Sequence, residues 1–147
     1  MIITDAFLGE HAVFYALFMH MEQSIPAADT LSQVKSQGAM LAAALASHAH
    51  LEEDLLFKTL EPHIGSTGPL AVMRMEHDQI EGGLERLPTV QDLEQARELL
   101  LQIVEVARGH FSKEEQILYP LASRTLSTET LIDLGAQWAM RRAVVLE

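Results

Sequence analysis

One motif occurs twice in this chain and limits its fold more than any other feature. The stretches 48–57 and 110–119 both read His-x-x-x-Glu-Glu-x-apolar-Leu-aromatic. Residues four apart lie on one face of an α-helix, about 5–6 Å from each other. Each copy therefore points an imidazole and a carboxylate in the same direction, which is half of a metal site. Two such halves facing each other across a helical bundle could hold a pair of metal ions, with the glutamates bridging or capping them.

Composition indicates one folded domain and disfavours several kinds of partner. A chain of 147 residues, 48% hydrophobic and 21% charged, is long enough to form a single domain over residues 1–147. The net charge of −11 disfavours phosphate backbones and anionic membrane surfaces, so we expect no nucleic-acid and no membrane partner. The absence of cysteine excludes disulfides, thiolate metal sites and iron–sulfur ligation.

The sequence also shows no targeting or membrane-spanning segment. The N-terminus reaches Asp5 without a basic segment followed by an apolar one, so no signal peptide is visible. The longest apolar run, Ala39–Ala46, is far shorter than the ~20 residues that span a bilayer. We expect a cytoplasmic protein, and nothing in the sequence indicates its oligomeric state.

Apolar residues at helical spacing predict four long helices and no strand. The first should run from Thr4 or Asp5 to a point before Pro26, the second from Asp29 or Thr30 to about Leu60, the third from Pro69 to Pro88, and the fourth from Thr89 or Asp92 to Tyr119 and Pro120. Gly38 is a weak point within the second helix, tolerable where a neighbouring helix packs closely.

The connections between these helices complete the predicted architecture. The turn residues of Glu61–Pro69 predict a loop, and Ser127–Thr130 resembles a capping box that opens a shorter fifth helix. We therefore predict an all-α fold, an up-down-up-down four-helix bundle with a short fifth C-terminal helix. The second and fourth helices run parallel in such a bundle, which brings the two motif copies to the same depth.

Each long helix carries one histidine among apolar neighbours: His11, His48, His77 and His110. A lone histidine of this kind is more often a satisfied core residue than a ligand. Four in one small bundle are hard to bury unless they are liganded or bonded to one another, because an unpaired polar group costs about 1–3 kcal/mol. This pattern favours a metal site.

A second register competes with the first in the motif of the second helix. Asp54 lies four residues after His50, as Glu52 does after His48. The His48 face gathers leucines and the His50 face gathers alanines, and the repeat with His110 and Glu114 also selects His48 and Glu52. Outer or solvated positions are then expected for the remaining polar residues near the motifs and for two further histidines: His50, Glu53, Asp54, Glu115, His20 and His63.

Four imidazoles and two or three carboxylates without sulfur suit iron, manganese or zinc. The Glu-x-x-His motif of ferritin-like di-iron proteins is absent. The chain instead resembles the hemerythrin-like, or HHE cation-binding, domain family. The resemblance covers essentially the whole chain and rests on four motifs in order: Gly9-Glu10-His11, the motif beginning at His48, Met75-Glu76-His77-Asp78, and the motif beginning at His110.

The resemblance implies a non-haem di-iron centre with two iron ions, for which zinc or manganese can substitute. It implies that Glu52 and Glu114 bridge the irons and that the ligand set is His11, His48, Glu52, His77, His110 and Glu114. The chain departs from oxygen-carrying hemerythrins at Glu81, where those proteins have a histidine, and at Glu115, where they have an aspartate. We expect Glu81, one turn after His77, to be a seventh ligand; the alternative is a solvated glutamate, helped by Gly82-Gly83 loosening the helix.

The function implied by the resemblance is a non-haem di-iron protein that binds or senses dioxygen or nitric oxide, or handles iron. More carboxylates and fewer imidazoles should keep the irons ferric more easily. The resemblance is closer to the bacterial branch that includes di-iron proteins implicated in repairing iron–sulfur centres, whose cysteine-containing N-terminal segment is absent here. One alternative is therefore a redox enzyme of oxidative or nitrosative stress defence, and a second is a structural bundle holding zinc or a single metal ion.

Overall fold

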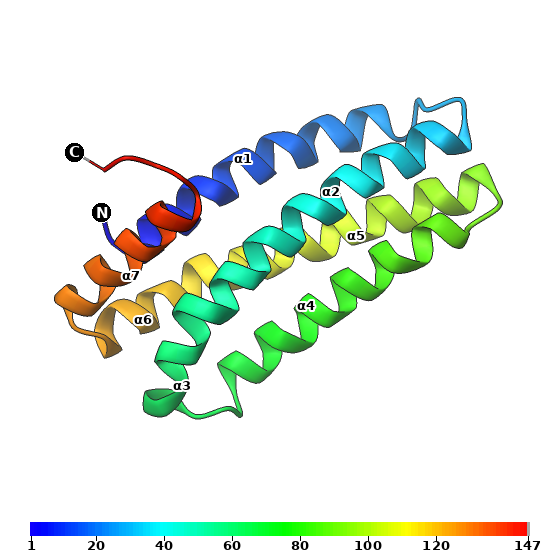
Figure 1. The fold of residues 1–147 in the computed structure, drawn as a ribbon. Coiled ribbons are helices and arrows are strands. Elements are labelled where there is room, and N and C mark those ends of the chain that lie inside the picture. The colour runs from blue at the N-terminus through cyan, green and yellow to red at the C-terminus, as the bar shows by residue number, and fades with distance from the viewer. Residues whose placement is uncertain (147) are drawn as a thin grey trace.

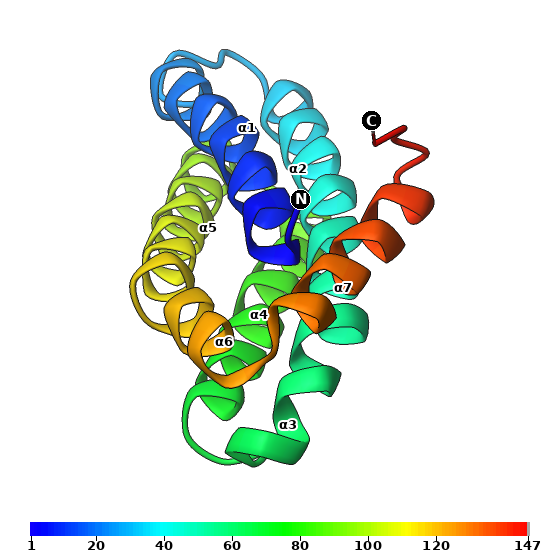
Figure 2. The same ribbon diagram turned by 90° about the vertical axis from the view of Figure 1, so that its left-hand side faces the viewer.

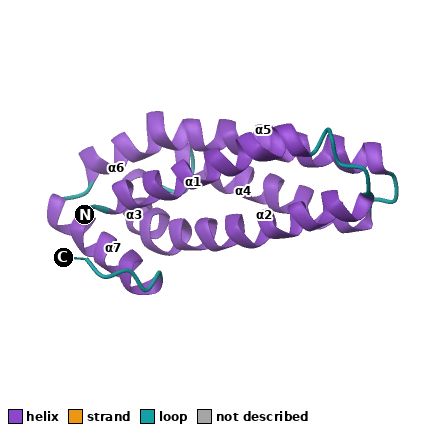
Figure 3. Ribbon diagram, turned by 90° about the horizontal axis from the view of Figure 1, so that it is seen from above, coloured by secondary structure: helices purple, strands orange, loops and turns teal. Residues whose placement is uncertain are grey.

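The computed structural model describes residues 1–146, in which all regular structure is helical (Figure 3). This confirms the all-α prediction. The four long helices are α1 (Ile3–Ser24), α2 (Leu31–Leu51), α4 (Pro69–Arg86) and α5 (Leu93–Lys113). Figure 1 shows them side by side, with α1 joined to α2 and α4 joined to α5 at one end of the molecule, and α2 joined to α4 at the other. No helix in this range combines the length and apolar character needed to cross a bilayer.

Three of the helix starts follow directly from local sequence. Thr30 caps α2 in a capping box with Gln33, Pro69 occupies the first turn of α4, and Asp92 caps α5 by accepting a hydrogen bond from the backbone of Gln95. The start of α1 differs from the prediction, because Ile2 precedes the helix without a side-chain cap and Asp5 lies in the first turn. An acidic residue there still interacts favourably with the helix dipole.

Both motif-bearing helices change their winding at the motif glutamate, which the sequence did not predict. The segments Glu52–Phe57 and Glu114–Leu118 are π-helical, and the N–H groups of Lys58 and Tyr119 donate to carbonyls five residues earlier. Helical structure then continues as α3 (Lys58–Ile64) and α6 (Tyr119–Thr125). The predicted ends near Leu60 and Tyr119 were therefore too early, and the predicted loop begins only at Gly65.

The C-terminal helix α7 (Thr128–Arg141) is capped by Ser127 and lies against the start of α1 (Figure 2). Gly135 permits this close approach, since a Cβ atom there would lie 2.4 Å from the carbonyl oxygen of Met1. A 3₁₀ turn, Leu87–Thr89, ends α4. Leu87 packs on Gly38 of α2, where an added Cβ would lie 2.1 Å from its side chain. The mid-helix glycine is thus explained by close packing.

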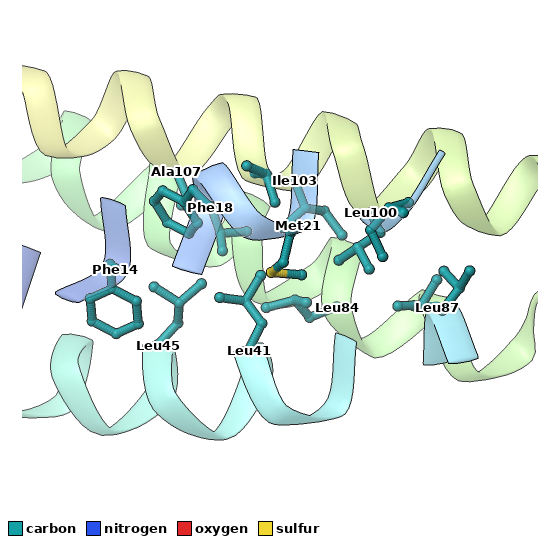
Figure 4. Packing of buried hydrophobic residues seen from close by; sticks show 14 of the residues in the cluster. Phe14, Phe18, Met21, Leu41, Leu45, Leu84, Leu87, Leu100, Ile103 and Ala107 are labelled. Atoms are coloured by element: carbon teal, nitrogen blue, oxygen red, sulfur yellow. The ribbon is translucent and has the colours of Figure 1, made fainter. Parts of the chain in front are cut away.

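The apolar core is divided into two clusters along the bundle. The first lies toward the α1–α2 connection and includes Phe18, Leu41, Leu84 and Leu100 (Figure 4). The second includes Phe7, Leu56, Leu70 and Leu118 at the other end. On α1, α2 and α4 the histidine falls between residues of the two clusters, and His110 of α5 lies between Ala107 of the first cluster and Leu118 of the second, which belongs to the π-helical turn after α5. The buried polar residues therefore form a layer between the two apolar clusters.

Candidate metal centre

The polar layer contains two groups of side chains that could each hold a metal ion. His11 and His48 form one group with Glu52 and Glu114, and their ligand atoms all lie within 4.8 Å of one another. His77 and His110 form the other group with the same two glutamates. We call these the first and second positions. Because both positions share Glu52 and Glu114, one carboxylate pair can serve two ions.

Carboxylates outside the two groups orient three of the four histidines. Nδ1 of His11 donates to Glu115 at 2.9 Å, and Nδ1 of His48 donates to Glu10 at 2.6 Å. Nδ1 of His110 donates to Glu76 at 2.9 Å, and Lys113 also donates to this carboxylate. An ionised carboxylate only accepts hydrogen bonds, so each imidazole keeps its proton on Nδ1 and turns the lone pair of Nε2 inward. This arrangement is typical of metal-binding histidines.

The inward-facing atoms fit a metal better than they fit one another. Nε2 of His11 lies 3.2 Å from Nε2 of His48, and neither carries the proton that a hydrogen bond would need. Among residues 1–146, no hydrogen-bond partner is found for several buried atoms of the centre: Nε2 of His77, Nε2 of His110, Oε2 of Glu52 and both carboxylate oxygens of Glu114. Unpaired buried polar atoms are costly, and a bound cation would satisfy all of them.

The two shared glutamates have opposite pKa shifts. Burial raises the pKa of Glu52, but attraction to His48 and His77 and the hydrogen bond from Tyr119, 2.6 Å long, hold it below the ordinary value. The pKa of Glu114 is raised by burial and by the negative charge of Glu52. Two fully buried carboxylates thus repel each other across the centre. Cations between them would remove this repulsion.

Aromatic rings and helix α7 enclose the first position. His11 stacks on Phe111 with ring centroids 3.9 Å apart, and His48 contacts Phe7 and Phe14 edge-on. The hydroxyl of Tyr119 lies 3.2 Å from Nε2 of His11. The first position is therefore shielded from solvent.

Helix α7 supports the first position through Glu10. The indole N–H of Trp138 and the guanidinium of Arg142 donate to Oε1 of Glu10, at 2.8 and 2.7 Å, and His48 donates to Oε2. Burial raises the pKa of Glu10, but these hydrogen bonds bring it down to about 2, so the carboxylate stays ionised. The C-terminal helix therefore holds Glu10 in place, and Glu10 in turn orients His48.

The second position is more open. His77 stacks on Phe57, and its Nδ1 has no carboxylate partner among the described residues 1–146. Its side chain is 16% exposed, against 2% or less for the other three histidines. His77 and His110 line a cavity of about 540 Å³ between α2 and α4, which His48 also reaches and His11 does not. Access from solvent is therefore built into one side of the centre.

The structure brings six of the seven expected ligands together. Glu81 lies outside both groups, with an exposed side chain at the cavity beside His77. His48 faces inward, whereas the side chain of His50 is 72% exposed and interacts with Asp54. The outer residues Glu10 and Glu76 were not singled out from the sequence. Each directly precedes a histidine of the ligand set but bonds to the histidine of a different helix, so only the packing of the helices reveals the pairing.

Comparison with known proteins agrees with this geometry. Neither the curated proteins nor the solved structures give a match. The model of the hemerythrin HHE cation-binding domain matches residues 2–122, a range that contains all six inward-facing residues and ends before α7. The chain therefore belongs to the hemerythrin HHE cation-binding domain family.

Proposed function

We propose that this protein holds two iron ions, one at each position, in an up-down-up-down four-helix bundle. The observation that carries the proposal is that Glu52 and Glu114 belong to both four-residue groups. His11 and His48 would complete the first position, and His77 and His110 the second. Four imidazoles and two carboxylates without sulfur match the ligand preferences of non-haem iron, for which zinc or manganese can substitute.

The site is suited to binding or sensing a small neutral molecule such as dioxygen or nitric oxide. Bound iron would supply redox activity and an open coordination position for such a ligand. The chain supplies the rest: Glu115, Glu10 and Glu76 fix the imidazoles, Tyr119 holds Glu52 by a hydrogen bond, and the cavity beside His77 gives access from solvent. Glu81 stands at that access route and outside both groups, so the predicted role as seventh ligand would require its side chain to turn away from the cavity mouth and toward His77.

Metal analysis combined with an optical spectrum tests the proposal. Protein produced under iron-replete conditions should contain about two irons per chain and absorb in the near ultraviolet, where zinc is silent. Exposure of the reduced protein to nitric oxide should change the spectrum. One metal ion per chain would contradict the dinuclear site, and zinc alone after iron-replete production would favour a structural bundle. Steady turnover of nitric oxide or peroxide with an electron donor would identify a redox enzyme instead.

A further inference from the structure

The cavity beside the second position is larger than a diatomic ligand requires. Its volume of about 540 Å³ lies within the range of roughly 300–1,000 Å³ found for sites that bind small organic molecules. His110 lines the cavity, is 1% exposed, and has no hydrogen-bond partner on Nε2 within residues 1–146. The hollow is thus continuous with the candidate metal centre.

The floor of the cavity is apolar and made partly of small side chains. Helix α2 contributes buried Leu45 and half-buried Ala42 and Ala49, and α4 contributes buried Ile80 and Leu84, while Ala46 lines the exposed edge. The alanines leave the space open, because their side chains end at Cβ. Such a floor favours a compact apolar group through burial of its surface.

Three acidic residues of α4 give the mouth of the cavity its charge. Asp78, Glu81 and Glu85 recur at helical spacing, line the cavity, and form no ion pair or side-chain hydrogen bond with any other residue of the range 1–146. Arg74 is the one arginine or lysine that lines the cavity within residues 1–146, and its charge is already paired. Arg74 pairs with Glu53 at 2.8 Å, and His50 lies 3.2 Å from Asp54. The unpaired charge at the mouth is therefore negative.

We propose that this cavity binds a small organic cation, an amine with a compact apolar body, beside the second metal position. The body would lie on the alanine and leucine floor, and the ammonium group would interact with Asp78, Glu81 and Glu85. The same charges would disfavour organic anions of equal size. The proposal rests on the proposed function only in placing a metal ion next to the bound amine. The groups that would bind the amine itself are side chains of the protein.

Three probes of nearly equal shape test the proposal: cyclohexylmethylammonium, cyclohexylmethanol and cyclohexanecarboxylate. Isothermal titration of the metal-loaded protein should give the tightest binding for the ammonium, weaker binding for the alcohol and the weakest for the carboxylate. The triple variant Asp78→Asn, Glu81→Gln, Glu85→Gln should weaken ammonium binding about tenfold and leave the alcohol unchanged. Ala42→Phe, at a half-buried lining position, should fill the cavity and abolish binding of all three.

A matched triple variant controls for net charge. Glu98, Glu105 and Glu129 are exposed and lie outside the cavity, so their replacement by glutamine removes the same charge and should leave all three affinities unchanged. Equal binding of carboxylate and ammonium, the same loss in both triple variants, or full binding by Ala42→Phe would overturn the proposal.

Metal content measured on the same samples separates this proposal from the proposed function. Protein with two irons per chain that does not bind the ammonium would overturn the amine site and leave the di-iron centre intact. Protein that lacks two irons but binds the ammonium in the expected order would overturn only the di-iron centre.

Discussion

The first position is enclosed by aromatic rings, outer carboxylates and helix α7, whereas the second lies beside a cavity. Both imidazoles at the first position donate to a carboxylate through Nδ1, but at the second position His110 alone does so within the described part of the chain. The two positions nevertheless share Glu52 and Glu114. The difference teaches that one shared pair of carboxylates can belong to two positions that differ in their outer hydrogen bonds and in their access to solvent.

Removing a shared carboxylate should eliminate metal binding at both positions. We expect Glu52→Ala to lower metal content from about two ions per chain to near none, because both positions lose a ligand and Glu114 loses its partner. The melting temperature should fall by roughly 10 °C. Metal analysis and thermal unfolding measure both effects. Glu53→Ala, next in sequence but outside both groups, is the control and should retain its metal. One ion remaining in Glu52→Ala would show that this carboxylate serves a single position.

Removing one histidine from each position should separate them. We expect both His48→Ala and His77→Ala to lose about one metal ion per chain. His48→Ala should lower the melting temperature more, because His48 is packed among aromatic rings and its loss leaves Oε2 of Glu10 without a donor, whereas His77 borders a cavity. His50→Ala, at an exposed position, should change neither quantity. A larger loss of stability in His77→Ala would show that the second position is the more tightly packed one.

Local patterns in the sequence were sufficient to predict the four long helices and the residues that converge on the centre. Capping at Thr30 and Asp92 follows from local hydrogen bonding, and the spacing of His48 and Glu52 follows from helix geometry. The π-helical turns were not predictable in this way. They change the hydrogen bonding of five or six residues and leave the apolar pattern nearly unaltered.

Contacts between helices account for what the sequence did not reveal about the centre. Glu10 and Glu76 orient histidines that lie 38 and 34 residues further along the chain, so no local pattern identifies them. For Glu81 the local pattern was visible, but it did not determine whether the side chain reaches the ligand groups. One helical turn was sufficient to place it beside His77, but His77 itself lies at the edge of the polar layer, so the next turn reaches the mouth of the cavity rather than the ligand groups.

Weakening the contact with α7 should affect the first position alone. We expect Trp138→Phe, which removes one donor to Glu10, to lower metal affinity at the first position by roughly tenfold and to leave the second unchanged. Competition with a chelator, followed as two separate dissociation steps, measures both affinities.

Arg141→Met is the control for simple undocking of α7, because Arg141 anchors the helix through Asp54 and does not contact Glu10. Equal weakening in Arg141→Met and Trp138→Phe would show that docking of the helix, rather than the hydrogen bond to Glu10, supports His48. Equal weakening of both positions in Trp138→Phe would contradict the separation between them.

The smallest expected effect is a change in the ionisation of Tyr15, which reports how closed the first position is. Burial raises the pKa of Tyr15, and the hydrogen bond to Glu115 raises it further, to about 12. The stability that this tyrosine contributes should thus be complete below pH 10 and be lost between pH 10 and 12, because the unfolded chain ionises first.

The difference in tyrosinate absorbance between wild type and Tyr15→Phe follows this residue alone. Glu115→Gln should move its midpoint down toward 10, since the neighbouring anion is gone, whereas Glu105→Gln on the outer face of α5 should not. A wild-type midpoint already near 10 would mean that solvent reaches the first position as readily as the second.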